Sequence, residues 1–287
     1  MVMQIKFDQV SADYQLGPIR SPLILNHVNL TIKAGSFAAI VGHTGAGKSS
    51  LLKMINGLIL PIAGQVTVGE KMIDQEVDKK TLTHVRKKVG MVFQFPESQL
   101  FAETVEQDIC FGPLNFGVPL SEAKEIASRV IKEVGLDCSI LSKSPFSLSG
   151  GQKRRVAIAG ILAMEPNILV LDEPGAGLDP AGKNEIMSLI RSWHEKQNLT
   201  TILVTHDMED VAQYADEVIV MEKGKISFQD DKRQFFSQND QFEKWRLELP
   251  HARRIQLKIE ESKGIKLPKV CLTLEELTDA IIEVGLA

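Results

Sequence analysis

The sequence of 287 residues contains few cysteines, no long apolar run and no excess of positive charge. Its three cysteines, Cys110, Cys138 and Cys271, are widely spaced and match no metal-binding or redox motif, so we expect reduced thiols. No basic segment followed by an apolar one opens the chain, which predicts no secretory signal. The longest aliphatic runs, such as ILVL at 168–171, fall far short of the ~18 residues that a membrane span requires. Contact with a bilayer would therefore need a partner protein.

The charge balance argues against a protein that binds nucleic acid. The chain has 33 Lys and Arg residues against 37 Asp and Glu residues, a formal net charge of −4. Proteins that bind nucleic-acid phosphates usually present a basic surface. Hydrophobic residues make up 44% and charged residues 24%, which is ordinary for a globular protein. The length suits one large domain and a smaller one.

The pattern of apolar residues predicts an α/β fold. Apolar and polar residues alternate through the first thirty-odd positions, as in half-buried antiparallel strands. Further on, 36–42, 168–171 and 201–205 read as short buried strands, and a helical pattern over 181–197 separates the last two. Strands that alternate with helices predict a parallel sheet with helices on its faces. Residues from about 95 to 165 read as helical, including an amphipathic segment that follows Ser121 as a candidate N-cap and ends at Gly135.

The residues after the turn EKGK at 222–225 are predicted to form an appended helical module. One of its helical segments carries a group of aromatic residues: Phe235, Phe236, Phe242 and Trp245. We therefore divide the chain into a first domain over 1–225 and a C-terminal helical module over 226–287.

The segment GHTGAGKSS at 42–50 matches the phosphate-binding pattern G-x-x-x-x-G-K-[ST] and lies between a predicted strand and a predicted helix. Its glycines let successive backbone N–H groups turn inward around an anion, and the helix adds its positive end. Lys48 is expected to reach the β- and γ-phosphates of a nucleotide and Ser49 to ligate Mg²⁺. The predicted nucleotide-binding residues of this loop are Gly42, His43, Thr44, Gly45, Ala46, Gly47, Lys48, Ser49 and Ser50.

Two carboxylates, Asp172 and Glu173, end the predicted strand in ILVLDEP. Ligands of open α/β sheets collect at the carboxyl ends of strands. Asp172 suits a position from which it holds Mg²⁺ through a water, and Glu173 can polarise a water for in-line attack on the γ-phosphate. A simple turn at the end of a strand is the alternative interpretation, which the nearby phosphate-binding pattern disfavours.

The segment LSGGQKRR at 148–155 resembles the signature of ATP-binding cassette (ABC) proteins. This resemblance implies a P-loop NTPase cassette with a RecA-like core, an antiparallel β subdomain and a helical subdomain at about 95–165, to which the small C-terminal module is added. It also implies that two cassettes pair head to tail around ATP. The signature residues of one cassette, here Ser149, Gly150, Gly151 and Gln152, then close on the ATP held by the other.

The remaining cassette motifs occur in the expected order. Gln94, in VFQFP, resembles the glutamine that contacts Mg²⁺ and the attacking water, and His206, in VTHD, resembles the switch histidine that contacts the γ-phosphate. With Glu173 they form the implied catalytic set. Asp179, in GLDP, resembles the aspartate that communicates across the dimer. Tyr14 is a candidate for stacking on adenine, although a core tyrosine is an alternative because GPIRSP at 17–22 separates it from the next strand.

Three segments, 93–117, 154–166 and 172–180, resemble the ATPases of energy-coupling factor (ECF) transporters, which import vitamins and transition metals. They match in particular the member of the paired ATPases that keeps the motifs DEP and GLDP. One departure is Gly175, where threonine is expected. Because this change leaves Glu173 in place, we expect activity to be retained.

The resemblance implies that the segment after Gln94 forms a groove for a short coupling helix of a transmembrane subunit. Leu100, Phe101 and Phe116 are the predicted groove residues, whereas Phe111 is expected to pack between the helical subdomain and the core.

The implied function is Mg²⁺-dependent ATP hydrolysis that powers uptake of vitamins or similar micronutrients at the cytoplasmic face of a bacterial membrane. The implied partners are a paralogous ECF ATPase subunit or a second copy, a transmembrane coupling subunit and, indirectly, a substrate-binding membrane subunit. The C-terminal module is a candidate for an additional dimer contact. Two alternatives are a soluble cassette protein that acts on DNA or ribosomes and the ATPase of a conventional importer.

Overall fold

The computed structural model describes residues 2–14 and 23–286 and contains two sheets. The first sheet is antiparallel, with the strand order β2-β1-β4-β5. Its strands are β1 (Ile5–Ala12), β2 (Leu25–Ile32), β4 (Ala63–Val68) and β5 (Lys71–Ile73). The alternation of apolar residues near the N-terminus follows from this arrangement, because one face of β1 and β2 is buried and the other is partly exposed.

The second sheet has six strands in the order β10-β9-β3-β8-β7-β6. Five of them are parallel, which confirms the predicted parallel sheet: β3 (Phe37–Val41), β6 (Val89–Val92), β7 (Ile168–Asp172), β8 (Thr200–Val204) and β9 (Glu217–Glu222). The three predicted strand segments are mostly apolar because β3, β7 and β8 are buried on both faces.

Neighbouring residues of these strands point into different layers, because side chains alternate along a strand. Ile168 and Val170 of β7 belong to the core formed with the antiparallel sheet and α1 (Lys48–Ile55). Leu169 and Leu171 belong instead to the core formed with the helical subdomain and α6 (Pro180–Gln197). The main sheet is therefore the middle layer of the molecule, and it fixes the relative positions of the two flanking parts.

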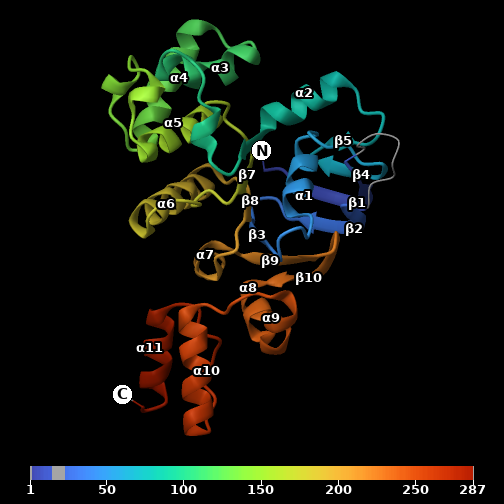
Figure 1. Cartoon of the computed structure of the whole chain (residues 1–287), viewed down its shortest axis with the longest axis vertical. Helices are drawn as coiled ribbons and strands as arrows, with labels where there is room; N and C mark the ends of the chain where they lie inside the picture. The colour runs from blue at the N-terminus through green and yellow to red at the C-terminus, as the bar shows by residue number, and fades with distance from the viewer. Residues whose placement is uncertain (1, 15–22, 287) are drawn as a thin grey trace.

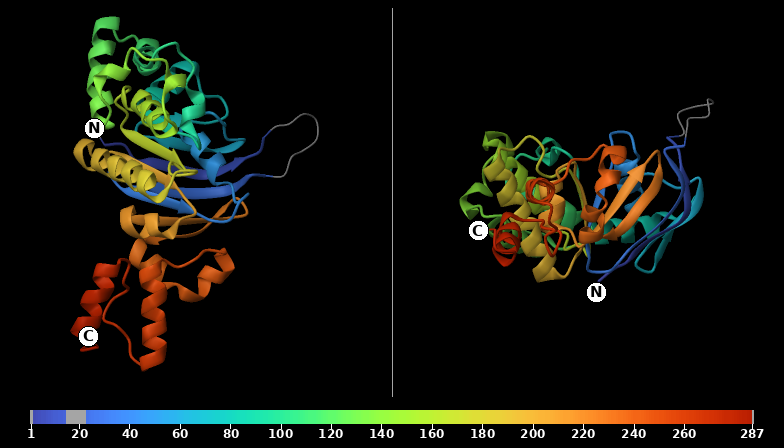
Figure 2. Two further views of the ribbon diagram at one scale, coloured as in Figure 1. Left: turned by 60° about the vertical axis from the view of Figure 1, so that its left-hand side comes forward. Right: turned by 90° about the horizontal axis from the view of Figure 1, so that it is seen from below.

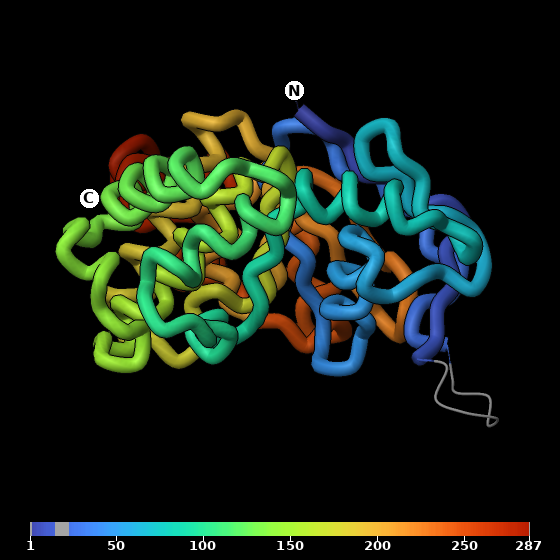
Figure 3. The backbone as a smooth tube through the Cα atoms, turned by 90° about the horizontal axis from the view of Figure 1, so that it is seen from above, coloured from blue at the N-terminus to red at the C-terminus, as the bar shows by residue number. Residues whose placement is uncertain are grey.

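The helical subdomain consists of α3 (Val105–Asn115), α4 (Leu120–Glu133), α5 (Gly150–Leu162) and short 3₁₀ turns. Seen from above, it and the antiparallel sheet with α2 (Lys79–Lys88) lie at opposite ends of the molecule (Figure 3). The predicted N-cap Ser121 is wrong. Pro119 supplies the extended backbone before the first turn, so Ser121 falls inside the helix. The predicted end is confirmed, since Gly135 follows α4 with a positive φ of 73°.

The proposed boundary after residue 225 is also wrong. β10 (Lys225–Asp231) pairs antiparallel with β9 and is the edge strand of the main sheet. The following helices, α8 (Lys232–Ser237) and α9 (Asn239–Trp245), also pack on this sheet. Their aromatic residues share one core with residues of β3, β9 and α7 (Met208–Tyr214). The sheet and its cover therefore extend about twenty residues past the expected boundary.

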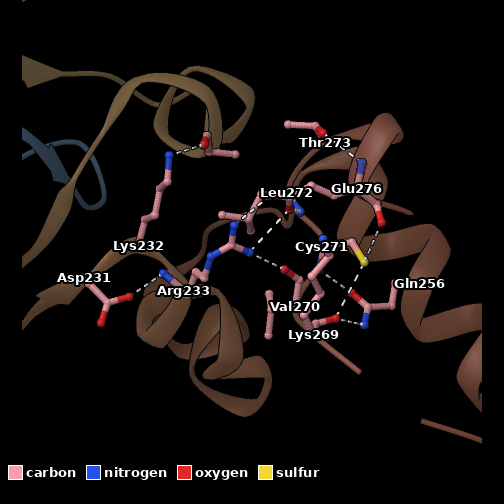
Figure 4. A network of polar contacts seen from close by, with 11 residues as sticks. Asp231, Lys232, Arg233, Gln256, Lys269, Val270, Cys271, Leu272, Thr273 and Glu276 are labelled. Atoms are coloured by element: carbon pink, nitrogen blue, oxygen red, sulfur yellow. Dashed lines mark hydrogen bonds and ion pairs between the residues drawn. The ribbon is translucent and has the colours of Figure 1, made fainter. Parts of the chain in front are cut away.

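The part that projects from this body is the helix pair α10 (His251–Lys263) and α11 (Leu274–Glu283) (Figure 2). It has its own small core of Ala252, Leu267, Cys271, Leu277 and Ala280. Figure 4 shows how polar contacts join it to α8: Arg233 donates to Glu276 of α11 at 2.6 Å and to the carbonyl of Val270 at 2.8 Å. In the part of the chain that the structure describes, no helix combines the length and the apolar character needed to cross a membrane.

Candidate functional site

The predicted site residues follow four adjacent strands of the main sheet. The phosphate-binding loop follows β3, Gln94 follows β6, Asp172 and Glu173 end β7, and His206 follows β8. The sheet order β3-β8-β7-β6 makes these strands neighbours, and all four are parallel. Their carboxyl ends therefore meet at one edge, where α/β folds bind ligands.

The backbone of the phosphate-binding loop requires glycine at two positions. Gly42 has a φ of 142°, and a Cβ there would meet the carbonyl oxygen of Met221 at 2.2 Å. Gly47 has a φ of 103° and precedes the first residue of α1. The loop therefore curls back and directs the N-terminus of α1 at its own hollow, which is an arrangement that binds anions.

Lys48 lies across this loop. Its ammonium group donates to the carbonyl oxygens of Gly42 at 2.6 Å and His43 at 3.1 Å. Burial lowers the pKa of Lys48, while the charges of Glu173 and Asp172 act in the opposite direction. A phosphate in the loop would add a further negative charge beside this ammonium group, which favours its charged form.

Ser49 and Asp172 supply oxygen atoms beside the loop. The side chain of Ser49 is hydrogen-bonded to Asp172, and burial raises the pKa of this carboxyl group. A hydroxyl and a carboxylate fit Mg²⁺, which prefers oxygen ligands and usually keeps several waters and phosphate oxygens. Over residues 2–14 and 23–286, no group of three or more His, Cys, Asp and Glu side chains is arranged to hold a metal ion without other ligands. The nucleotide phosphates and water would have to complete the coordination.

The structure brings the three predicted catalytic residues together, with Gln94 and His206 on either side of Glu173. Gln94 donates to one carboxylate oxygen of Glu173 at 3.2 Å, and Nδ1 of His206 lies 3.1 Å from the other. The backbone of Glu173 is in the left-handed region, with a φ of 49°, and its N–H donates to Val204 at 3.0 Å. Such a backbone conformation is costly for a residue other than glycine and is concentrated at functional sites.

The signature residues lie at the N-terminus of α5, in the helical subdomain (Figure 1). Ser149 and Gln152 form a reciprocal capping box: the Ser149 hydroxyl accepts from Gln152 N–H at 3.3 Å, and the Gln152 side chain accepts from Ser149 N–H at 3.1 Å. A cavity of about 600 Å³ borders the phosphate-binding loop and His206, and among the described residues that line it there is none from 149–152. The signature residues therefore take no part in this cavity.

Two further predicted residues have local roles in the chain itself. Asp179 is the N-cap of α6 and accepts from Gly182 N–H at 2.8 Å. Tyr14 is half exposed, and its hydroxyl lies 3.0 Å from that of Ser50, which is buried beside the phosphate-binding loop. The alternative of a core tyrosine is therefore wrong. The segment 17–22 that motivated this alternative lies outside the described residues.

Two of the three predicted groove residues line a hollow of about 190 Å³ between α3 and α5. Leu100 and Phe101 line it, but among its described lining residues Phe116 does not occur. Phe116 instead ends α3, so its side chain belongs to the far end of that helix. Phe111 lines the hollow, with its ring edge-on to that of Phe101 and 4.9 Å between centroids.

The expectation that Phe111 is packed inside was wrong, because α3 turns another face inward. Its buried residues are Val105, Ile109, Cys110 and Pro113, and the side chain of Phe111 is half exposed. The i, i+4 spacing of Val105 and Ile109 was the signal that identifies the buried face.

Sequence analysis also missed Arg154, which joins the site to the hollow. Its side chain is only 2% exposed and makes a two-pronged ion pair with Glu97 at 2.8 and 2.9 Å. It also donates to the carbonyl oxygens of Pro174 and Ala176, just after Glu173. In sequence it is one basic residue of LSGGQKRR, and nothing in that pattern separates it from its neighbours Lys153 and Arg155.

The fold and the site together define a P-loop ATPase of the ATP-binding cassette type. Residues 25–176 match the model of the ABC transporter family. The chain is 50% identical to the energy-coupling factor transporter ATP-binding protein EcfA2 of Bacillus cereus over 98% of this chain and 96% of that protein. It is 51% identical to the EcfA2 protein of Geobacillus kaustophilus, over 97% of this chain and 96% of that one.

Solved structures agree with this assignment. The structure of cbiO1 from Clostridium perfringens, described as part of the ABC transporter complex cbiONQ, has a TM-score of 0.74 and 34% identity, and covers 92% of this chain and all of that one. A dimeric post-hydrolysis state of the cassette MJ0796, bound to ADP and Pi, has a TM-score of 0.70 and 31% identity, over 80% of this chain and 99% of that one. The chain belongs to the ABC transporter family and, within it, to the ATP-binding proteins of energy-coupling factor transporters. Its function is ATP hydrolysis that supplies energy to such a transporter.

Proposed function

We propose that this chain is one half of a paired ATPase, in which ATP lies between its phosphate-binding loop and the signature of a facing ECF ATPase subunit. The observation that carries this proposal is the open surface at Gly150 and Gly151. Apart from the adjoining residues and the backbone of α5 itself, no described atom lies within 4 Å of a Cβ built on either residue, and neither has a positive φ. The fold of this chain therefore does not require glycine there, whereas a phosphate approaching the helix N-terminus from outside would. MJ0796, the cassette bound to ADP and Pi, is a dimer.

In this arrangement, the residues of the chain act on the γ-phosphate and the attacking water. Lys48 neutralises phosphate charge, while Glu173 orients and polarises the water for in-line attack. Gln94 and His206 hold the carboxylate of Glu173 from both sides, and with ATP bound they would contact the water and the γ-phosphate. Ser49 and, through water, Asp172 would hold Mg²⁺ together with Gln94, and the ion would neutralise developing charge on the phosphates. Tyr14 supplies an exposed ring for the adenine.

We further propose that the hollow formed by Leu100, Phe101 and Phe111 receives a helix of a transmembrane coupling subunit. Two of these side chains are largely exposed, at 60% for Phe101 and 50% for Phe111, and apolar patches of this kind suit a protein partner. The chain would then lie at the cytoplasmic face of a bacterial membrane. It would act only indirectly with a substrate-binding membrane subunit that selects a vitamin or a similar micronutrient.

The facing ATPase is a paralogue or a second copy of this chain, and the helix pair of α10 and α11 offers an additional contact for it. Leu274 and Ile282 of α11 are exposed, at 58% and 59%. The net charge of −4 argues against nucleic acid as a partner.

The substitution Glu173→Gln tests this proposal, with the exposed Glu122→Gln as a control. We expect the Glu173 variant to lose ATP turnover but to form ATP-dependent dimers, measured by analytical ultracentrifugation, because the amide keeps the shape of the side chain and loses its charge. Undiminished hydrolysis would remove Glu173 from its role. Hydrolysis at full rate by dilute chains shown to be monomeric would refute the pairing.

A further inference from the structure

A cluster of charged side chains joins α6 to α7. The ammonium group of Lys183, in the first turns of α6, is ion-paired with the carboxylates of Asp207 and Asp210, the latter at 2.8 Å. The three side chains are largely shielded from water, at 21%, 37% and 10% exposure. Burial opposes the charge of Lys183, but the hydrogen bonds to both carboxylates outweigh it and raise the pKa of this lysine. The cluster is therefore a charged and persistent link between two helices.

This cluster lies directly beside the switch histidine. Asp207 follows His206, and its backbone N–H donates to the hydroxyl of Thr205 at 3.0 Å. One carboxylate oxygen of Asp207 caps α7 by accepting from Glu209 N–H at 2.8 Å, while the other pairs with Lys183. Hydrogen bonds thus hold the residues on both sides of His206, and Lys183 binds one of these residues, Asp207.

Removal of the ammonium group would leave two carboxylates facing each other without a cation. Both carboxylates contact the same ammonium group, so they lie close together. Each would then disfavour the ionised form of the other, and one of the two carboxylates would move or take up a proton. Asp210 is the more deeply buried of the two, so Asp207 has the greater freedom to turn toward water. If the side chain of Asp207 rotated toward water, the adjoining backbone of His206 would shift. The imidazole of His206, whose Nδ1 lies 3.1 Å from Glu173, would then move relative to that carboxylate.

Gly175 provides the space in which the Lys183 side chain lies. A Cβ at residue 175 would meet Cγ of Lys183 at 2.8 Å, Cδ at 3.3 Å and Cε at 3.4 Å. The backbone of Gly175 does not have a positive φ, so its conformation alone does not require glycine. Because Cγ is close to the root of the side chain, a methyl group at 175 would displace the whole of Lys183 rather than its tip.

We propose that Lys183 is a positioning residue for ATP hydrolysis, which holds Asp207 and through it His206 against Glu173, and that Gly175 is small in order to admit it. This inference rests on the roles proposed above for Glu173 and His206. It also gives a physical reason for the glycine at residue 175, where the resemblance to ECF ATPases predicts threonine.

The first test replaces Lys183 in the full chain, purified with its co-expressed transporter subunits. Lys183→Met keeps the length of the side chain without its charge, Lys183→Arg keeps the charge, and Lys196→Met is a control on the exposed end of the same helix. We expect Lys183→Met to lower kcat at least about tenfold, since small misplacements of catalytic groups have large effects on rate. KM for ATP should change less than about twofold, because the phosphate-binding loop is untouched. Lys183→Arg should recover part of kcat.

A kcat for Lys183→Met equal to that of the unaltered protein would overturn the inference. The inference would also be overturned if the fall in kcat came with a similar fold-loss in ATP affinity and a lower thermal midpoint, because that combination indicates a general structural role. His206→Ala, assayed in parallel, distinguishes failure of the role of Lys183 from failure of the role of His206. If His206→Ala is inactive and Lys183→Met is fully active, only the role of Lys183 fails. If His206→Ala is fully active, the proposed role of His206 itself fails.

The second test uses Gly175 and does not depend on the stability of Lys183→Met. Gly175→Ala should lower kcat in the presence of Lys183 but should have no effect in a Lys183→Ala background, because that background has no Cγ at residue 183 for the new methyl group to meet. Equal losses from Gly175→Ala in both backgrounds would show that the two residues act independently and would overturn the inference.

Discussion

Replacement of Arg154 by methionine should destabilise the protein more than any other single loss of charge at the helical subdomain. The guanidinium group of Arg154 is 2% exposed and makes four hydrogen bonds: two to Glu97 and one each to the carbonyl oxygens of Pro174 and Ala176. It thereby joins α5 to the segment after Gln94 and to the loop after Glu173. Methionine fills similar space and can make none of these bonds.

The size of the effect follows from what is left unpaired. Removing one partner of a buried ion pair costs about 3–5 kcal/mol, because the other charge stays behind without compensation. The Glu97 side chain is 25% exposed, so water can partly replace Arg154, and we expect a value near the lower end, about 3 kcal/mol. At roughly 2 °C per kcal/mol for a chain of this size, the thermal midpoint should fall by about 6 °C.

Thermal unfolding monitored by circular dichroism measures this shift, and the double variant Arg154→Met/Glu97→Met is the matched control. An apolar pair can replace a buried ion pair at little cost, so the double variant should be more stable than Arg154→Met alone. A midpoint for Arg154→Met within about 1 °C of the unaltered protein would refute the reasoning. So would a double variant that loses the sum of both single effects.

The pH dependence of the same difference has a definite sign. Burial raises the pKa of Glu97, but the hydrogen bonding and charge of Arg154, together with a backbone hydrogen bond, outweigh it and hold this pKa below its ordinary value. A depressed carboxyl pKa contributes stability above the unfolded pKa, about 4.3 for Glu, and this contribution is lost as the pH falls through the folded value. The difference between the unaltered protein and Arg154→Met should therefore be largest near pH 7 and should shrink as the pH falls, because acid neutralises the uncompensated Glu97 of the variant and removes the ion pair of the unaltered protein.

Two further predictions concern the hollow and the C-terminal helices. Phe101→Glu should abolish uptake in vesicles reconstituted with the whole transporter but leave basal ATP hydrolysis within about twofold, because its side chain is 60% exposed and lies outside the catalytic residues; a parallel loss of both activities would contradict a coupling role. Phe235→Ala should destabilise the protein by about 3–5 kcal/mol, since the ring is fully buried and contacts Phe228, Phe236, Phe242 and Trp245. Phe146→Ala, at a side chain that is 64% exposed, is its control in thermal unfolding, and equal midpoints for the two variants would refute this prediction.

Three of the five parallel strands were predicted, because burial on both faces leaves a short and mostly apolar run. β3, β7 and β8 all have this pattern. β10 was missed for the opposite reason. It is an edge strand whose residues are exposed or only partly buried, so no apolar run marks it, although Ile226 and Phe228 do alternate with polar residues in KISFQDD. The domain boundary was then drawn in the turn before it, although backbone pairing with β9 makes it part of the main sheet.

The catalytic set could be predicted only through the resemblance to ABC proteins. Gln94 and His206 are 79 and 33 positions from Glu173, and no spacing rule relates them. What unites them is the strand order β8-β7-β6, which a single sequence does not reveal. Lys183 was missed for a related reason. In sequence it is one of several polar residues of an amphipathic helix, and only the packing of α6 beside α7 gives it two carboxylate partners.

Few residues separate the catalytic residues from the hollow, because the segment after Gln94 contacts both. Phe95, directly after Gln94, has a left-handed backbone with a φ of 57°, and its ring lies 5.9 Å from the guanidinium carbon of Arg154. A Cβ added to Gly177, in the loop after Glu173, would meet the Phe95 ring at 3.2 Å.

A change in the hydrogen bond between Gln94 and Glu173 would therefore displace Phe95 and, through it, Arg154. Arg154 lies on α5, which forms one wall of the hollow. Interiors packed at this density transmit small displacements instead of absorbing them. If the hollow receives a coupling helix as proposed above, the ion pair of Arg154 with Glu97 would make the segment from Gln94 to Phe101 move together with α5.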